Sequence, residues 1–339
     1  MNPIAVSVGG FTVYWSSIVI VLGVLAGFLL SLSLCRGGKC RASAVICFYP
    51  LVVFFSVIFC RVIHWYISMD KYASFWAALT NYAVGGYCIA GVIPAALLAG
   101  GIARMLGLIG RVGSLFDAVI PGALMSVAFI RLADVFGTAC RSKITITTPL
   151  LCRLPFSFPV TDTAGNVIYR FATFFISFLL LLILSIFLVR LYRQRRDALM
   201  VSGVSGTGNI ACLGLAFACA VEIVLDSTRS DPVSMHFVFL TKLNKYVGFI
   251  SVTMLTCAIC ILCVFIRYFK GAKRKSKMKA SLLLVLYIVS LIGVAAAEYL
   301  VQRFTGMFIL FRSIQTLSAV LMALSVWFAY KCCRADYYI

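Results

Sequence analysis

The sequence predicts an all-α, polytopic membrane protein. Of its 339 residues, 63% are hydrophobic, whereas a soluble domain contains about 45–50% apolar residues. Apolar runs of about 20 residues recur along the chain, and each is long enough to cross a hydrocarbon core about 30 Å thick. A membrane β-barrel is not expected, because its strands would alternate polar and apolar residues instead of staying apolar throughout.

About nine transmembrane helices are expected, each one an apolar run bounded by polar or charged residues. In chain order they cover residues 11–34, 43–63, 85–103, 115–138, 168–190, 209–227, 246–267, 280–300 and 306–330. The segments that follow the odd-numbered spans are short and basic: CRGGKCR, RMLGLIGR, RLYRQRR, RYFKGAKRKSKMK and KCCR. The positive-inside rule assigns these segments to the cytoplasm, so the N-terminus is expected outside and the C-terminus inside.

The remaining connections alternate with the basic ones and are therefore expected outside, at about 64–84, 139–167, 228–245 and 301–305. Within the second of them, SKITITTPLLCRLPFSFPVTDTAGN combines β-branched residues with turn signals. This pattern predicts a small extracytoplasmic excursion of strands and turns. On the cytoplasmic side, VSGVSGTGN at 201–209 predicts a flexible connector and lacks the spacing of a phosphate-binding loop.

The charge and the cysteines exclude several other functions. The formal net charge is +20, but the basic residues fall in short loops and not on a contiguous face, so no nucleic-acid partner is expected. Most of the fourteen cysteines lie in apolar runs, including CAICILC at 257–263. There they are expected to pack as small apolar side chains, so neither a metal nor a cofactor is expected. Cys140 and Cys152 share one polar loop, and would form a disulfide only if that loop faces an oxidising compartment.

The start of the chain carries no lysine or arginine before the first apolar run. The basic region that opens a cleavable signal peptide is therefore missing, and no cleavage is expected.

Charged residues gather near the outer ends of three outward-running spans. The pairs are Arg61 with His64 and Arg131 with Asp134, and the third span carries Glu222, Asp226 and Arg229. At 1.5 Å per residue, Arg131 lies about 24 Å above the inner edge of its span, and the charges of the other two spans reach similar heights. Glu222, Asp226 and Arg229 are spaced to share one helical face. Intramembrane charges usually face the bundle interior or a wet cavity, which predicts a polar cavity in the outer half of the membrane.

Two simpler interpretations remain open for each of these residues. An arginine near a helix end can extend to the lipid headgroups, and an arginine–aspartate pair can tie two helices together. Glu222 is the hardest to explain as a side chain that extends to the headgroups, because it is acidic, short and the deepest of the set, and it needs a partner or a proton. An arginine-rich cavity at this depth suits a phosphate, which guanidinium binds through two parallel hydrogen bonds. The residues alone therefore predict a site for a phosphate-bearing amphiphile.

Five stretches, in order, resemble the prolipoprotein diacylglyceryl transferase family. The opening IAVSVGGFTVYWSSIVIVLGVLAGF is similar to that family's start, and FCRVIHWY at 59–66 puts Arg61 on a motif arginine. GGYCIAGVI at 85–93 resembles its H-G-G motif. In DAVIPGALMSVAFIRLADVFG, the spacing from Asp117 through Pro121 to Arg131 matches the family without a gap. EIVLDSTRSD at 222–231 resembles its last motif, with Asp226 on the glutamate, Arg229 on an arginine and Asp231 on the aspartate.

This resemblance covers residues 1–270 and implies a seven-span transferase-like domain, with its small outer loops near 139–167. Residues 271–339 would then add a basic cytoplasmic linker and a two-span hairpin. Glu298 and Arg312 flank its outer turn at comparable depth and are expected to pair there in a structural role. The implied location is the bacterial cytoplasmic (inner) membrane. The implied partners are phosphatidylglycerol, or a similar anionic phospholipid, and a prolipoprotein signal peptide.

The implied reaction moves a diacylglyceryl group from phosphatidylglycerol to the thiol of a lipobox cysteine and releases glycerol phosphate. It needs phosphate neutralisation and removal of the thiol proton. On this basis Arg131 and Arg229 would bind and stabilise the phosphate, with Arg61 and Glu222 as further binding residues. Asp226 would orient an arginine.

The chain departs from the family at positions that affect which residue could accept the thiol proton. The family histidine falls on Ala90, a motif arginine on Glu222, the motif asparagine on Asp134 and a motif glutamate on Ala139. The proton would then go to His64, Asp134 or Glu222. The alternative is a relative that binds anionic lipid or lipoprotein precursors without catalysis. Small-solute transport is less favoured, because no pair of broken helices occurs in corresponding halves.

Overall fold

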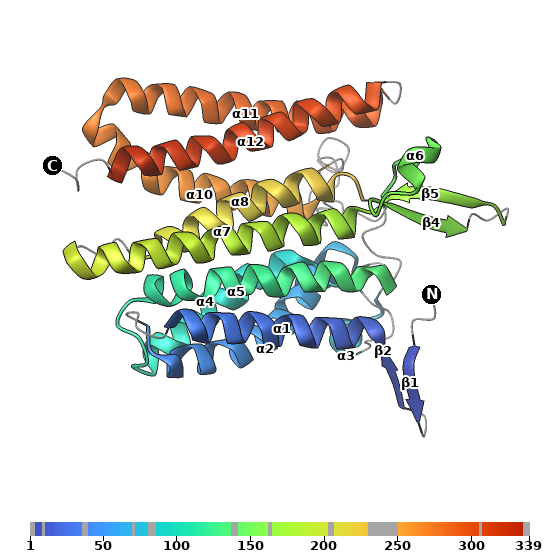
Figure 1. Cartoon of the computed structure of the whole chain (residues 1–339), viewed down its shortest axis with the longest axis horizontal. Helices are drawn as coiled ribbons and strands as arrows, with labels where there is room; N and C mark the ends of the chain where they lie inside the picture. Colours follow the sequence, from blue (N-terminus) through green and yellow to red (C-terminus); the bar gives the residue numbers. More distant parts are fainter. Residues whose placement is uncertain are drawn as a thin grey trace. The chain divides into compact units, whose positions relative to one another are not determined.

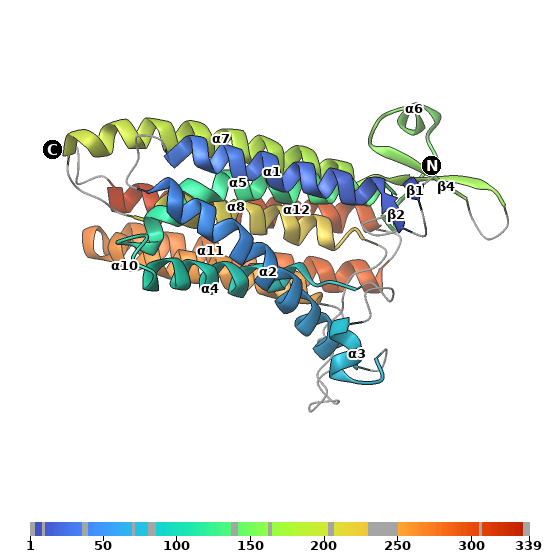
Figure 2. The same ribbon diagram turned by 90° about the horizontal axis from the view of Figure 1, so that it is seen from below.

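A computed structural model of the chain describes residues 4–8, 11–35, 40–69, 72–80, 86–136, 142–161, 165–202, 207–229, 250–304 and 307–334 (Figure 1 and Figure 2). The described part is mainly helical. The chain forms two compact units, which are described separately. Unit 1 comprises residues 1–49, 100–214 and 228–232, and unit 2 comprises 50–99, 215–227 and 233–339.

Unit 1 is built on three long helices, α1 (Trp15–Cys35), α5 (Val112–Ala133) and α7 (Thr173–Ser202), with α5 packed against both others. The strands β1 (Ile4–Val8) and β2 (Phe11–Tyr14) form an antiparallel hairpin before α1. A second sheet, in the order β3-β5-β4, precedes α7. Both sheets lie at the same end of these helices (Figure 1). The second sheet and its neighbours are β3 (Thr145–Ile146), the short α6 (Pro149–Cys152), β4 (Ser157–Thr161) and β5 (Val167–Phe171).

Helices α1 and α5 approach closely because both carry glycine where they cross. A Cβ added to Gly27 would lie 2.3 Å from the Gly122 carbonyl oxygen, and one added to Gly122 would lie 2.2 Å from the Gly27 carbonyl oxygen. Ser31 Oγ donates to the Gly27 carbonyl at 2.9 Å, and Ser126 Oγ donates to the Gly23 carbonyl at 3.2 Å. Small residues and serine hydroxyls are the usual means by which membrane helices associate, since lipid supplies no hydrophobic drive.

The first turn of α8 (Asn209–Asp226) is capped by a side chain from another helix. The Asp117 carboxylate, on α5, accepts hydrogen bonds from the backbone N–H groups of Gly208 at 2.6 Å, Ile210 at 2.8 Å and Ala211 at 2.8 Å. These N–H groups would otherwise lack partners, and a negative charge is favourable at a helix N-terminus. The aspartate of the motif that resembles the family's D-x-x-x-P segment therefore fixes the start of α8.

Unit 2 contains the antiparallel helices α10 (Val252–Lys275), α11 (Lys277–Arg303) and α12 (Phe308–Arg334). Aromatic contacts join them: the Phe265 and Tyr287 rings stack at 4.4 Å, and the Tyr268 and Tyr330 rings meet edge to face at 5.3 Å. Unit 2 also contains the short helix α3 (Phe75–Thr80) and the 3-10 turn η3 (Ile89–Gly91). Three helices contribute residues to both units: α2 (Ala42–Ile67), α4 (Val92–Met105) and α8.

Eight helices in the described part of the chain are long and apolar enough to cross a membrane, namely α1, α2, α5, α7, α8, α10, α11 and α12. The all-α, polytopic membrane architecture is therefore confirmed. The remaining predicted span, 85–103, corresponds to a shorter apolar helical run at Ile89–Met105.

Several predicted span boundaries are wrong by a few residues. Residues 11–14 and 168–171 are strands, so α1 begins at Trp15 and α7 at Thr173. Residues 86–88 are not helical. In the basic segment after the seventh span, α10 continues to Lys275, Ser276 caps the next helix, and α11 starts at Lys277.

The predicted excursion of strands and turns is confirmed as the three-stranded sheet formed by β3, β4 and β5. Three other expectations concern residues that lie outside the described ranges. These are the Cys140–Cys152 disulfide, through Cys140, the motif aspartate Asp231 and the departure at Ala139.

Candidate functional site

Arg61 and His64 lie in the last two turns of α2 and contact the same segment of unit 2. Arg61 is 1% exposed. Its Nε donates to the carbonyl of Ala78, and one Nη donates to the carbonyl of Gly86 at 2.9 Å. The guanidinium carbon lies 5.1 Å from the centroid of the Tyr72 ring. Arg61 therefore ties α3 and the loop before η3 to the end of α2, while its proposed role in phosphate binding stays a prediction.

His64 is buried and held on two sides. Its Nδ1 lies 3.0 Å from the Tyr72 hydroxyl, and the two rings meet edge to face. Its ring packs against Gly86, where an added Cβ would lie 2.3 Å from Cε1 of His64. A side chain whose ring nitrogen is oriented by a second polar group has the arrangement expected of a general base.

Arg131 lies in the last turn of α5, and Asp134 begins the 3-10 turn η4 (Asp134–Phe136) that follows. Arg131 is 7% exposed, whereas Asp134 is half-buried. The backbone N–H of Asp134 donates to the Arg131 carbonyl, so the two residues occupy consecutive turns. A cation is favourable at this helix end, where carbonyl groups point outward.

Arg229 follows α8 and pairs through its backbone with Ser142, just before the three-stranded sheet of β3, β4 and β5. The segment is fixed by its neighbour Thr228, whose carbonyl accepts from the Lys143 N–H at 2.9 Å and whose hydroxyl lies 3.0 Å from that of Thr173. Val135 of η4 packs against the same start of α7. Unit 1 therefore brings Arg131, Asp134 and Arg229 to one end.

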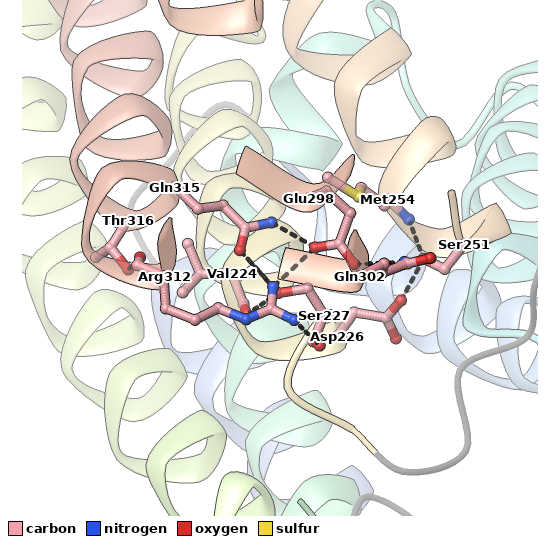
Figure 3. Close-up of polar contacts among 10 residues, drawn as sticks. All are labelled: Val224, Asp226, Ser227, Ser251, Met254, Glu298, Gln302, Arg312, Gln315 and Thr316. Carbon is pink, nitrogen blue, oxygen red and sulfur yellow. Dashed lines mark hydrogen bonds and ion pairs between the residues drawn. The ribbon is translucent and has the colours of Figure 1, made fainter. Parts of the chain in front are cut away.

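Glu222 and Asp226 lie one turn apart at the end of α8 and belong to unit 2. Asp226 is 1% exposed, and its Oδ2 accepts a hydrogen bond from the hydroxyl of Ser251 (Figure 3). Ser251 is the N-cap of α10, and its Oγ also accepts from the Met254 N–H at 3.0 Å. The Asp226 carboxylate is thus bonded at the positive end of α10, which compensates for its unfavourable place at the C-terminal end of α8.

The predicted pair of Glu298 and Arg312, at the turn between α11 and α12, is confirmed. Arg312 Nη1 lies 2.7 Å from Glu298 Oε2. Gln315 joins the pair, with its Nε2 donating to Glu298 Oε2 at 2.9 Å. Figure 3 shows these side chains converging beside the end of α8.

The burial of four charged side chains argues against one simpler interpretation, namely that they extend along the lipid to the headgroups. A side chain that extends along lipid to the headgroups would lie on the outer surface of the protein. Arg61 and Arg131 are instead 1% and 7% exposed, and Glu222 and Asp226 are buried as well. These four side chains therefore point into the protein.

Sequence reasoning missed the residues that hold the charged groups in place. Tyr72, Ser251 and Gln315 are uncharged and lie in or next to apolar segments, so no spacing rule singles them out. Only Ser251 carried a local signal, because serine is a common N-cap, but the predicted span 246–267 runs past it without a break.

Comparison with known proteins places these observations in a family. The family model for prolipoprotein diacylglyceryl transferase matches residues 3–269. A phosphatidylglycerol–prolipoprotein diacylglyceryl transferase of Clostridium kluyveri is 24% identical over 250 residues, which is 74% of this chain and 93% of that protein. Phosphatidylglycerol–prolipoprotein diacylglyceryl transferase 1 of Clostridium perfringens is 26% identical over 139 residues, or 41% of this chain and 46% of that protein.

Proposed function

Because the chain belongs to the prolipoprotein diacylglyceryl transferase family, we propose that it transfers a diacylglyceryl group from phosphatidylglycerol to a prolipoprotein. The acceptor is the thiol of a lipobox cysteine. The bond between the glyceryl carbon and the phosphate oxygen breaks, a thioether bond forms, and glycerol phosphate leaves. The observation that carries this proposal is the family match over residues 3–269, in which the five resembling motifs occur in order.

We assign phosphate binding to Arg131 and Arg229. Arg131 is buried in the last turn of α5, and Arg229 belongs to a segment held at the same end of unit 1. A guanidinium donates two parallel hydrogen bonds to a phosphate, and a buried one is less screened by water. The same groups would stabilise the charge that develops on the departing glycerol phosphate. Asp134, one helical turn from Arg131, is proposed as its counter-ion or as a proton acceptor.

The thiol proton needs an acceptor, and we favour His64. Its ring is fixed by Tyr72 and Gly86, which supports a defined orientation. Glu222 remains a second candidate and Asp134 a third. Asp226 is proposed to orient an arginine, and Arg61 to organise the segment that holds the His64 ring.

We also propose how the chain lies in its membrane. It crosses the bacterial cytoplasmic membrane nine times, counting the shorter run at Ile89–Met105, with the N-terminus outside and the C-terminus in the cytoplasm. The basic residues at the end of α10 and the start of α11 support this orientation. Residues 1–270 form the transferase domain, and the hairpin α11–α12 is an addition to it.

The test is direct transfer by the purified full-length protein. Liposomes containing phosphatidylglycerol are incubated with the protein and a lipobox peptide, and thioether-linked diacylglyceryl peptide is measured by mass spectrometry. A peptide with serine in place of the lipobox cysteine is the control. The proposal expects product only with the cysteine peptide. If phosphatidylglycerol binds but no product forms, the protein is a lipid-binding relative and the enzyme proposal is wrong.

A further inference from the structure

The hairpin α11–α12 begins after the last residue of the family match, at 269, yet it contacts the end of α8 directly. Arg312 Nη2 donates to the backbone carbonyl of Ser227 at 2.7 Å. Its Nη1 donates to Glu298 Oε2 at 2.7 Å and to Gln315 Oε1 at 2.6 Å. Figure 3 shows the Arg312 guanidinium between the hairpin and the end of α8. A residue outside the matched region therefore supplies a cation to a helix inside it.

The Ser227 carbonyl is one of the groups that a helix end leaves without an intrahelical partner. A guanidinium is well suited to this position, because it adds positive charge where the helix dipole is negative. Ser227 is joined to the same network through its side chain, since Ser227 Oγ donates to Gln315 Oε1 at 3.1 Å. The end of α8 is thus held by both its backbone and its side chain.

The network around Arg312 is buried, and its members are joined to one another by hydrogen bonds. Glu298 is 5% exposed and Gln315 is 0% exposed. Glu298 accepts from Arg312, from Gln315 at 2.9 Å and from Gln302 at 3.1 Å. A buried polar network is destabilised when one charged member is removed, because the charge of its partner is then left unpaired. Such a network suits the task of fixing a helix end.

The helix end that it fixes carries proposed site residues. Asp226 directly precedes Ser227, Glu222 lies one turn earlier, and Arg229 follows two residues later. A residue that sets the position of Ser227 therefore also sets the direction in which the Asp226 carboxylate points. Displacements of about 1 Å at a reacting site cost on the order of 100-fold in rate, so this position matters for chemistry.

We propose that Arg312 is a positioning residue for the transferase, acting through Ser227 on Asp226 and the segment that leads to Arg229. The inference rests on the proposed function. If the chain is the proposed transferase, the hairpin α11–α12 contributes to its activity, because Arg312 supplies a cation to the end of α8.

The test uses the full-length protein in liposomes with phosphatidylglycerol and a lipobox peptide. Arg312→Gln removes the guanidinium. The double variant Arg312→Gln/Glu298→Gln removes both charges together, so that no buried carboxylate is left unpaired. Arg312→Lys keeps the charge but loses the fork. The matched control is Arg303→Gln on the same hairpin, where the exposed Arg303 lies 5.4 Å from the centroid of the Tyr299 ring.

A positioning role predicts that kcat falls about tenfold in the double variant while KM for phosphatidylglycerol changes less than about twofold. The thermal unfolding midpoint should match that of Arg303→Gln, and Arg312→Lys should recover part of the lost kcat. A role in stability alone would lower the unfolding midpoint and leave kcat per folded molecule unchanged, which would overturn the proposal.

Hydrogen exchange gives a measure that does not depend on activity. In the double variant, backbone amides of residues 222–229 should exchange about fivefold faster than in the wild type, because one hydrogen bond at the helix end is lost. Arg303→Gln should leave these amides unchanged. If the wild type shows no transfer, the proposed function fails, and this comparison still decides whether Arg312 positions the end of α8. Unchanged exchange in residues 222–229 would refute it.

Discussion

The ring of His64 lies directly against Gly86, so that a Cβ added to Gly86 would sit 2.3 Å from Cε1 and 2.6 Å from Nε2 of His64. Gly86 also has a φ of +85°, a backbone conformation that residues with a Cβ rarely adopt. Glycine is therefore required here for two independent reasons. The first reason, the close contact with the ring, couples the backbone of the loop before η3 to the orientation of the His64 imidazole.

Replacing Gly86 by alanine should displace the His64 ring. Gly86→Ala is expected to destabilise the protein by about 1–3 kcal/mol and to reduce transfer by about tenfold or more. The measurements are thermal unfolding and initial rates of transfer. Gly107→Ala is the control, since Gly107 has a φ of +68° but nothing within 4 Å of an added Cβ. If both variants lose the same activity, backbone strain and not the displaced ring is the cause.

Removing the Tyr72 hydroxyl tests whether an oriented imidazole matters. Tyr72→Phe deletes the group 3.0 Å from His64 Nδ1 and keeps the ring that faces Arg61. We expect a stability loss of about 1 kcal/mol and a larger effect on kcat than on KM. Tyr66→Phe, at an exposed position of α2, the helix that carries His64, should change neither. Wild-type kcat in Tyr72→Phe would argue against His64 as the base.

Arg131→Ala should abolish lipid binding or turnover while the protein is still expressed and inserted. Arg131 lies in the last turn of α5 and is 7% exposed, so the alanine variant loses a buried guanidinium. Arg131→Lys should recover only part of the activity, because lysine lacks the planar fork that binds phosphate through two hydrogen bonds. Phosphatidylglycerol binding and transfer are measured together. The control variant is Arg104→Ala, because Arg104 is exposed. If Arg131→Ala binds lipid and transfers it as well as this control does, Arg131 is not part of the site.

The close crossing of α1 and α5 should be sensitive to a single methyl group. In Gly27→Ala the new Cβ meets the Gly122 carbonyl, so the helices must separate, at a cost of about 1–3 kcal/mol. Gly101→Ala offers the opposite case: its added Cβ meets nothing within 4 Å, and helix propensity should raise stability by up to about 1 kcal/mol. Unfolding in detergent compares the two. Equal stability of the variants would mean that the crossing is looser than the structure indicates.

The membrane spans could be predicted because each is a long apolar run, a signal that needs no tertiary information. The first and last residues of these spans were harder to predict. Phe11–Tyr14 and Val167–Phe171 are mainly apolar strands that lead directly into apolar helices, so the sequence shows one run where the structure has two elements. The basic segment Lys273–Lys279 is rich in lysine, a good helix former, and most of it is helical for that reason.

The charged residues of the candidate site could be selected from the sequence because charge in an apolar run is costly and therefore conspicuous. The Glu298–Arg312 pair could be predicted for the same reason, since two opposite charges flank one short turn. The partners of the other charges could not. Tyr72 reaches His64 across a loop, and Ser251 reaches Asp226 from another helix, contacts that depend on how the chain folds back on itself.

The bond between Arg312 and the Ser227 carbonyl joins residues 85 positions apart. During synthesis α8 is complete well before α12 leaves the ribosome, because membrane helices emerge in chain order and domains fold as they are made. A nascent chain that ends before α12 already contains all five motifs that resemble the family, yet the C-terminal end of α8 still lacks its cation. With the positioning role proposed for Arg312, the C-terminal end of α8 therefore reaches its final arrangement only once the last hairpin has been translated, so the timing of its synthesis governs when this part of the protein is complete.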